Sequence, residues 1–232
     1  MAKLYGIGTG PGDWELMTLK AVRIIKECDI IAVPGSGGTV NAAWETAAKA
    51  VPEIRNKEII RLSMPMTRDR DILEEARERA ADTVMKFLGE FKDVAFLTLG
   101  DPSVYSTYMY VHEKVRKRGG EAEMIPGIPS FCAVAARLGE SLTEAHMPLH
   151  IIPASYKVTE ECAKLPGTRV FMKSGRQMGR LKRILAELPS ADVKMVENCG
   201  MDNEKVYLSA EEIDENAGYF ATVIVKETGE EK

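Results

Sequence analysis

The first half of the chain alternates short apolar segments with longer amphipathic ones, and this alternation limits the fold more than any other feature. The apolar segments have the length and composition of buried strands, and most end near a glycine or proline turn. The expected strands are residues 4–8, 29–33, 58–62, 94–99 and 122–125. The expected helices are residues 16–25, 41–51, 71–91 and 105–117. Because strands that alternate with helices favour a mostly parallel sheet, we predict an α/β domain over residues 1–122.

The later half has a different pattern, in which short strands outnumber helices. The expected strands are residues 149–152, 169–172, 193–197, 205–208 and 222–226. The expected helices are residues 130–139, 159–165 and 177–188. This pattern predicts a second, mixed α/β domain with antiparallel pairs over residues 123–232, reached through Met124–Pro129. Since no long linker is present, we expect the two domains to pack closely.

The composition argues against several classes of function. The 232 residues include 31 Lys and Arg and 35 Asp and Glu, which gives a formal net charge of −4. This balance provides no large basic surface for DNA or RNA. Apolar runs fall short of the roughly 20 residues that cross a bilayer, and the N-terminus lacks the parts of a signal peptide. We therefore expect a cytoplasmic protein that binds neither nucleic acid nor membrane.

Cysteine and histidine positions predict no metal site and no redox pair. No two of the cysteines lie close in sequence. They are Cys28, Cys132, Cys162 and Cys199. We expect buried free thiols, as is usual in a reducing compartment. The histidines are too scattered to suggest metal ligands, and they are His112, His146 and His150.

The first glycine turn invites comparison with nucleotide-binding loops. Gly6-x-Gly8 ends the first predicted strand, as in a dinucleotide-binding fingerprint. However, Pro11 stands where the third glycine belongs, and Asp29 precedes the second strand instead of following it. The lysine-bearing phosphate loop is also absent. Nicotinamide chemistry and nucleoside triphosphate hydrolysis are therefore disfavoured, although the helix start after this turn can still bind an anion.

Two further turns follow predicted strands and indicate a ligand site. Gly100-Asp101-Pro102 follows strand 94–99, and Pro126-Gly127-Ile128-Pro129-Ser130 follows strand 122–125. Ligands bind at the carboxyl edge of a parallel sheet, where glycine permits close approach to the backbone. Hydroxyl groups near this edge come from Ser103, Tyr105, Ser106 and Thr107. We expect the two turns to lie on adjacent strands and form two sides of one crevice, although ordinary tight turns fit the spacing equally well.

The residues alone do not identify a catalytic group. Asp13, Asp101 and Glu197 are candidate acids or bases, but no nearby residue pairs with them. The sequence has no Gly-x-Ser-x-Gly nucleophile elbow, so no motif supports esterase chemistry. Met172, at the end of a predicted strand, is a candidate pocket residue.

Three motifs together resemble those of one protein family. They are Gly6-x-Gly8-x-Gly10-Pro11-Gly12-Asp13, Leu99-Gly100-Asp101-Pro102 and Pro126-Gly127-Ile128-Pro129-Ser130. This combination resembles the tetrapyrrole methylases, also called the precorrin methyltransferase family. The resemblance continues through Val170–Lys173 and Glu197–Cys199. Residues 99–110 are similar to one branch in particular, the precorrin-2 or cobalt-factor II C-20 methyltransferases of cobalamin biosynthesis.

The resemblance implies a fold, a methyl donor and a set of contacts. The fold would be two α/β domains with a trough between them, and the protein would form a homodimer. The donor would be S-adenosylmethionine, with S-adenosylhomocysteine as the product. By analogy, the donor contacts would be Pro11, Leu99, Gly100, Asp101, Tyr105, Ser106, Thr107, Ser130, Phe131, Met172, Asn198, Cys199 and Ala221. Gly10 and Asp13 would contact the tetrapyrrole, and Gly35–Thr39 would form part of the trough rim.

The implied reaction transfers a methyl group from the sulfonium of the donor to a meso carbon of the tetrapyrrole. The acceptor of the displaced ring proton stays open between a carboxylate and a water molecule. Lys and Arg are expected to line the trough, because the substrate carries many carboxylates. Three alternatives remain: methylation of another ring position, a diphthine-synthase-like activity, and a donor-binding module with a degenerate site.

Overall fold

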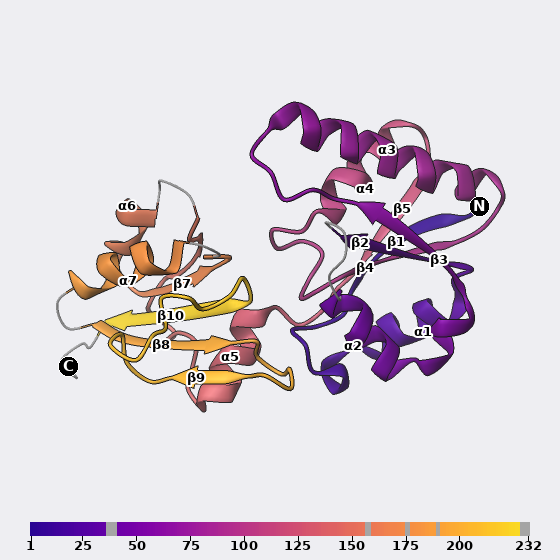
Figure 1. Ribbon diagram of the computed structural model, residues 1–232. Helices are drawn as coiled ribbons and strands as arrows, with labels where there is room; N and C mark the ends of the chain where they lie inside the picture. Colours follow the sequence, from indigo (N-terminus) through magenta and orange to yellow (C-terminus); the bar gives the residue numbers. More distant parts are fainter. Residues whose placement is uncertain (36–40, 156–158, 175–176, 189–190, 228–232) are drawn as a thin grey trace. The chain divides into compact units, whose positions relative to one another are not determined.

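The computed structural model describes residues 1–35, 41–155, 159–174, 177–188 and 191–227. Within these residues the chain forms two compact units, each with its own five-stranded sheet (Figure 1). The units are Met1–Pro129 and Ser130–Lys232. The division therefore falls after Pro129, whereas the expected boundary was residue 122. The reason is that strand β5 (Glu121–Ile125) pairs with strand β1 (Lys3–Gly8) and belongs to the first sheet.

The first unit alternates strands and helices as the sequence predicts. Its sheet is parallel, with the strand order β3-β2-β4-β1-β5. The other elements of this unit are η1 (Trp14–Leu16), α1 (Leu19–Glu27), β2 (Ile30–Gly35), α2 (Ala42–Ala50), η2 (Pro52–Asn56), β3 (Glu58–Ser63), α3 (Arg70–Gly89), β4 (Val94–Thr98) and α4 (Tyr108–Lys117).

Helices cover both faces of the first sheet. Along β4, Phe96 lies in the apolar cluster formed with α3 and α4, and Leu97 lies in the cluster formed with α1 and α2. This division follows from the two-residue period of a strand. Figure 1 shows the two helix pairs on opposite faces of the sheet. Because β4 is buried on both faces, its sequence is apolar without alternation, as is usual for a parallel sheet.

The direction in which the chain crosses the first sheet reverses between β1 and β4. From β1 the chain passes through α1 to β2, which lies beyond β4. From β4 it passes through α4 to β5, which lies on the other side of β1. The loops that follow these two neighbouring strands therefore meet at the carboxyl edge. Open α/β sheets bind ligands at such a topological switch point.

Helix α4 begins at Tyr108, later than the start expected at residue 105. Tyr105 has a φ of 48°, a left-handed conformation that an α-helix cannot include. The Oγ atom of Ser106 accepts a hydrogen bond from the Tyr108 N–H at 3.1 Å. This bond satisfies a backbone donor at the start of the helix, in the manner of a side-chain cap.

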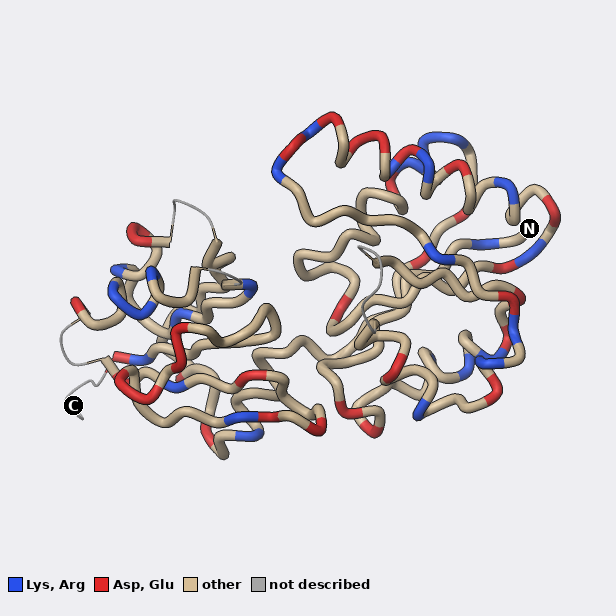
Figure 2. The backbone as a smooth tube through the Cα atoms, viewed as in Figure 1, with Lys and Arg blue, Asp and Glu red and all other residues tan. Residues whose placement is uncertain are grey.

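Ion pairs join α3 to α4 on the outer surface of the first unit. Glu78 pairs with Lys114 and Arg118, and Asp82 lies 2.7 Å from Arg118. Acidic and basic residues accordingly alternate over this surface (Figure 2). Such pairs at the surface contribute little individually, because water and salt screen them.

The second unit has the mixed sheet that the sequence predicts. Its strand order is β6-β7-β10-β8-β9, in which β10 runs antiparallel to both of its neighbours. The elements are α5 (Ser130–Leu138), β6 (Leu149–Pro153), α6 (Thr159–Ala163), β7 (Thr168–Met172), α7 (Met178–Ala186), β8 (Ala191–Glu197), β9 (Lys205–Tyr207) and β10 (Ala221–Glu227).

Helices also cover both faces of the second sheet. Met178 and Leu181 of α7 lie in one apolar cluster with Phe171 and Val223. The preceding residue of β10, Thr222, faces the other way, because strand side chains alternate. It contacts α5 on that other face through the Ser130 hydroxyl. The two-domain α/β fold expected from the sequence is therefore confirmed.

The cysteines are free, as predicted, but they are not all buried. Cys28 and Cys199 are buried, Cys162 is half-buried and Cys132 is exposed. The prediction is wrong for Cys132, which lies on the solvent side of α5 while its neighbours Phe131 and Ala133 are buried. Among the described residues, no helix is both long enough and apolar enough to span a bilayer.

Candidate functional site

Three glycine turns of the first unit meet at the carboxyl end of β1. The Gly100 N–H donates to the Gly10 carbonyl at 2.7 Å, and the Gly10 N–H donates back at 3.3 Å. The Gly127 N–H donates to the Asp101 carboxylate at 3.0 Å. The turns after β4 and β5 were expected on adjacent strands, and this is wrong because β1 lies between them. They converge nevertheless, because they pack over the end of that central strand.

Glycine is required in these turns by close packing. A Cβ atom at Gly8 would lie 2.5 Å from the Gly127 nitrogen, and a Cβ atom at Gly127 would lie 2.2 Å from the Gly100 carbonyl oxygen. Both distances are far below van der Waals contact, so a side chain at either position would force the backbone to shift. We call Gly8, Gly10, Gly100 and Gly127 the first edge. Sequence spacing identified the glycines but not this mutual contact.

Gly100 is itself buried, but it differs from the other glycines of the first edge because no atom crowds the position of a Cβ atom. Its φ is +74°, and no heavy atom lies within 4 Å of the position that a Cβ atom would take. A side chain here would therefore project into a volume that the protein leaves free. A ligand can approach the backbone closely at such a glycine. Of the predicted donor contacts in the first unit, Gly100 has the geometry that best fits direct contact.

The Asp101 carboxylate holds this edge together. One oxygen accepts hydrogen bonds from the N–H and hydroxyl of Ser103, the first at 2.8 Å. The other accepts the bond from Gly127 described above. Because both oxygens bind protein groups, the geometry supports a structural role for the side chain. Its predicted contact with the donor stays a prediction.

The loop between β4 and α4 contains further residues of the first unit that are predicted to contact the donor. Leu99 is half-buried, whereas Thr107 and the Tyr105 ring are exposed, the ring by 43%. Ser106 is half-buried, and its hydroxyl lies 2.9 Å from that of Thr98 at the end of β4. Tyr105 and Thr107 are thus accessible to a ligand, while Ser106 anchors the loop to the sheet.

The loop after β1 is anchored by hydrogen bonds and contains the residues predicted to bind the tetrapyrrole. Gly10 and Pro11 are buried. Asp13 is half-buried and accepts a hydrogen bond from the Glu15 N–H at 2.9 Å, which caps η1. Thr46 of α2 donates to the Gly12 carbonyl at 3.2 Å. Most of the rim predicted at Gly35–Thr39 lies outside the described residues.

Four predicted donor contacts come together at one edge of the second sheet. Met172 ends β7 and pairs with Thr222, and Glu197 ends β8 and pairs with Ala221. Because β10 runs opposite to both strands, its start lies between their ends. Met172, Asn198, Cys199 and Ala221 therefore share this edge, which we call the second edge.

The start of α5 joins the second edge. The Ser130 hydroxyl lies 3.2 Å from that of Thr222, next to Ala221, and Phe131 is buried in the same helix. The motif Pro126–Ser130 is thus divided, since Gly127 belongs to the first edge and Ser130 to the second unit. The sequence alone treated this motif as a single turn.

Glu204 stabilises the turn that carries Asn198 and Cys199. Its carboxylate accepts the Gly200 N–H at 2.9 Å and pairs with Arg137 of α5. Burial opposes ionisation of this carboxyl, but the Gly200 N–H, Arg137 and the Cys199 thiol outweigh it and lower its pKa below the ordinary value. Glu204 was missed from the sequence, because Arg137 is distant along the chain and a lone glutamate carries no motif.

Each candidate acid or base accepts hydrogen bonds from groups of its own unit. Glu197 is buried and accepts the Gly218 N–H at 2.6 Å and the Tyr207 hydroxyl at 3.4 Å. Asp13 and Asp101 accept bonds from their own loops, as described above. Each of these carboxylates thus supports local structure, and the geometry assigns none of them as the acceptor of a proton.

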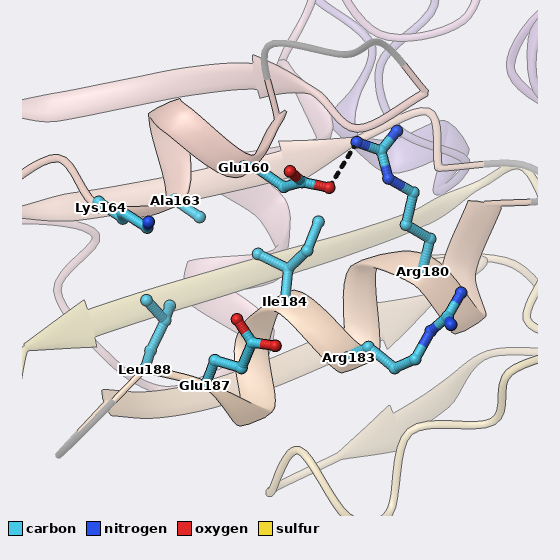
Figure 3. Close-up of a pocket in the computed structure, with 8 residues that line it drawn as sticks. All are labelled: Glu160, Ala163, Lys164, Arg180, Arg183, Ile184, Glu187 and Leu188. Carbon is cyan, nitrogen blue, oxygen red and sulfur yellow. Dashed lines mark hydrogen bonds and ion pairs between the residues drawn. The ribbon is translucent and has the colours of Figure 1, made fainter.

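A surface groove of about 560 Å³ lies between α6 and α7 (Figure 3). Glu160 of α6 pairs with Arg180 of α7 at 2.8 Å across it. None of the predicted donor or tetrapyrrole contacts lines this groove. Among the described residues, no group of three or more His, Cys, Asp and Glu side chains has a geometry suited to a metal ion.

The fold matches that of known methyltransferases. The crystal structure of uroporphyrin-III C-methyl transferase from Thermus thermophilus, complexed with S-adenosylhomocysteine, aligns with a TM-score of 0.70 and 20% sequence identity. The alignment covers 97% of this chain and 98% of that chain. This likeness shows that the chain has the two-domain α/β fold of that structure.

Sequence comparison defines the family. The model for Tetrapyrrole (Corrin/Porphyrin) Methylases matches residues 3–214. The probable cobalt-precorrin-2 C(20)-methyltransferase of Methanocaldococcus jannaschii is 34% identical over 97% of this chain and 96% of its own. The precorrin-2 C(20)-methyltransferase of a Sinorhizobium species is 31% identical over 97% of this chain and 95% of its own. The chain belongs to the tetrapyrrole methylase family, which confirms the resemblance.

Proposed function

We propose that this methyltransferase transfers the methyl group of S-adenosylmethionine to C-20 of precorrin-2 or its cobalt form. The observation that carries the proposal is the match to two C-20 methyltransferases along nearly the whole of each chain. A match restricted to the donor-binding motifs would fit any tetrapyrrole carbon equally well. The full-length match favours C-20 over the other ring positions.

The residues present fit S-adenosylmethionine as the donor. The open position at Gly100 lies at the switch point of a parallel sheet, where a ligand can reach the backbone. Tyr105 and Thr107 offer exposed polar groups beside it. On the second edge, Met172 and Ala221 are apolar and buried, and Asn198 is polar and half-buried. We infer that the donor binds both sets of residues, with Gly10 and Asp13 in contact with the tetrapyrrole.

The role of this chain in the reaction is alignment. The donor supplies an activated methyl group, and the electron-rich macrocycle is itself a nucleophile. In the transfer the sulfur–carbon bond breaks, a carbon–carbon bond forms at the ring, and the displaced ring proton passes to a carboxylate or a water molecule. Positioning the two reacting atoms supplies up to about 7–11 kcal/mol in favourable cases. Backbone atoms fixed by glycine packing suit this task, because they move less than long side chains.

The homodimer and the cytoplasmic location implied by the resemblance stay predictions. The oligomer is testable by sedimentation of the purified protein. A donor-binding module without activity is disfavoured by the intact first edge, since a degenerate site would be expected to lose its glycines.

The test is product analysis with purified substrates. The enzyme is incubated with S-adenosylmethionine and either precorrin-2 or its cobalt form, and the product is examined by mass spectrometry and NMR. We expect one added methyl group, assigned to C-20. A methyl group on another carbon would establish another ring position. The absence of turnover with both substrates, in protein that binds S-adenosylhomocysteine, would contradict the proposal.

A further inference from the structure

The residues that directly follow β7 and β8 have an unusual backbone conformation. Lys173, directly after Met172, has a φ of 57°, and Asn198, directly after β8, has a φ of 54°. Left-handed conformations are uncommon for residues other than glycine, and for a long side chain such as lysine they carry an energetic cost. Residues held in this way cluster at ligand sites. Both lie on the second edge.

The Lys173 side chain is held beside this edge. Its ammonium lies 5.8 Å from the centroid of the Tyr219 ring, which packs edge-on against Phe220 at 5.4 Å. An aromatic face attracts a cation at such a distance. Lys173 is half-buried, and desolvation lowers its pKa below the ordinary value. A cation in this setting interacts more strongly with an anion than one in bulk water.

The next residue has a buried hydroxyl without a partner. Ser174 is 1% exposed, and its Oγ atom makes no hydrogen bond within the part of the chain that the structure describes. Its backbone carbonyl, by contrast, accepts the Gln177 N–H at 2.9 Å. An unsatisfied buried hydroxyl is unfavourable and needs an explanation. A ligand that accepts a hydrogen bond from it would provide one.

We propose that Lys173 and Ser174 form a carboxylate-binding subsite at the second edge. An ammonium and a hydroxyl both donate hydrogen bonds, and a carboxylate has only acceptors. The proposal rests on the proposed function, because both reactants carry carboxylates: the methionyl group of the donor has one, and the tetrapyrrole has several. The subsite is defined by this shared chemistry, and the experiment identifies which reactant supplies it.

The first arm of the test measures donor binding. S-adenosylhomocysteine is titrated calorimetrically into the wild-type protein and the Lys173→Gln, Ser174→Ala and Lys164→Gln variants. Lys164 is the matched control, because it is an exposed lysine of the same unit that lines the groove in Figure 3. If the donor supplies the carboxylate, Lys173→Gln weakens binding by about tenfold to a hundredfold. Decarboxylated S-adenosylmethionine then binds both the wild-type protein and this variant equally weakly.

The second arm measures the tetrapyrrole. If the macrocycle supplies the carboxylate, donor binding is unchanged and the KM for precorrin-2 rises by about tenfold or more in Lys173→Gln. Ser174→Ala separates a ligand contact from a structural role. Loss of an unpaired hydroxyl leaves the melting temperature equal or higher, whereas loss of a structural bond lowers it. We expect weaker ligand binding at unchanged or raised thermal stability.

Two results would overturn the subsite. One is that Lys173→Gln changes neither constant more than Lys164→Gln does. The other is that Ser174→Ala lowers the melting temperature and leaves both constants unchanged. These results are distinguishable from failure of the proposed function, which would appear as absent turnover by the wild-type enzyme. Ser174→Ala keeps the test decisive if Lys173→Gln does not fold.

Discussion

The first and second edges differ in whether backbone atoms or side chains form them. The first edge is backbone: Gly10 and Gly100 exchange hydrogen bonds, and Gly8 and Gly127 approach each other too closely for any side chain. The second edge is formed largely by side chains, with Lys173 and Asn198 left-handed although neither is glycine. Backbone atoms are held in fixed positions, but their chemistry does not change when one residue is substituted for another. Side chains can be varied, so we expect the second edge to determine ligand preference and the first to hold the part common to all ligands.

The largest expected effect comes from placing one methyl group in the first edge. In Gly127→Ala the new Cβ atom would lie 2.2 Å from the Gly100 carbonyl oxygen, so one of the turns must move. We expect the free energy of unfolding to fall by about 3 kcal/mol or more. Urea denaturation followed by circular dichroism measures this change.

Gly89→Ala is the matched control for that substitution. Gly89 lies in α3, and a Cβ atom there would meet no heavy atom within 4 Å. Alanine favours a helix over glycine, so this variant should be unchanged or more stable by about 1 kcal/mol. A Gly127→Ala protein as stable as Gly89→Ala would show that the first edge is not closely packed.

A smaller effect on binding is expected from Glu204, which acts on the second edge indirectly by holding the turn that carries Asn198 and Cys199. Glu204→Gln keeps the shape of Glu204 but removes the charge that pairs with Arg137. The turn carrying Asn198 and Cys199 should loosen, and the Kd for S-adenosylhomocysteine should rise by about threefold to tenfold. An unchanged Kd would exclude this turn from the donor site.

The same variant should change the response to acid. The pKa of Glu204 is lowered in the folded protein, so its contribution to stability is present above the pKa of the unfolded chain, near 4.3. That contribution is lost as the pH falls through the lower, folded value. We therefore expect wild-type stability to decline more steeply below about pH 4 than that of Glu204→Gln. Parallel declines would indicate that the ionised carboxylate does not stabilise the fold.

The sequence predicts the first edge better than the second for a physical reason. Strands followed by glycine turns are local patterns, and in a parallel sheet all carboxyl ends reach one edge. The convergence of Gly100 and Gly127 was therefore expected, even though β1 separates their strands. Tyr105 was placed in a helix because its neighbours are helical in pattern. The hydrogen bond from the Tyr108 N–H to the Ser106 hydroxyl, at the start of the helix, was a local signal that the prediction overlooked.

The second edge was reached only through the resemblance to a family. Met172, Asn198 and Ala221 lie far apart in sequence, and antiparallel pairing around β10 brings them together. Local periodicity does not specify which strands pair. Glu204 and Ser174 were not found at all, because a lone glutamate and a lone serine have no motif, and their roles depend on burial and on distant partners.

The central claim is that the open space above Gly100 receives the donor. The most direct test is calorimetric titration of S-adenosylhomocysteine into wild-type protein, Gly100→Asn and Gly119→Asn. Both glycines are left-handed and have no heavy atom within 4 Å of a Cβ position, and asparagine tolerates this conformation. We predict that Gly100→Asn weakens binding by about a hundredfold or more, while Gly119→Asn, at the end of α4, binds like the wild type. Equal affinity in all three folded proteins would contradict the account.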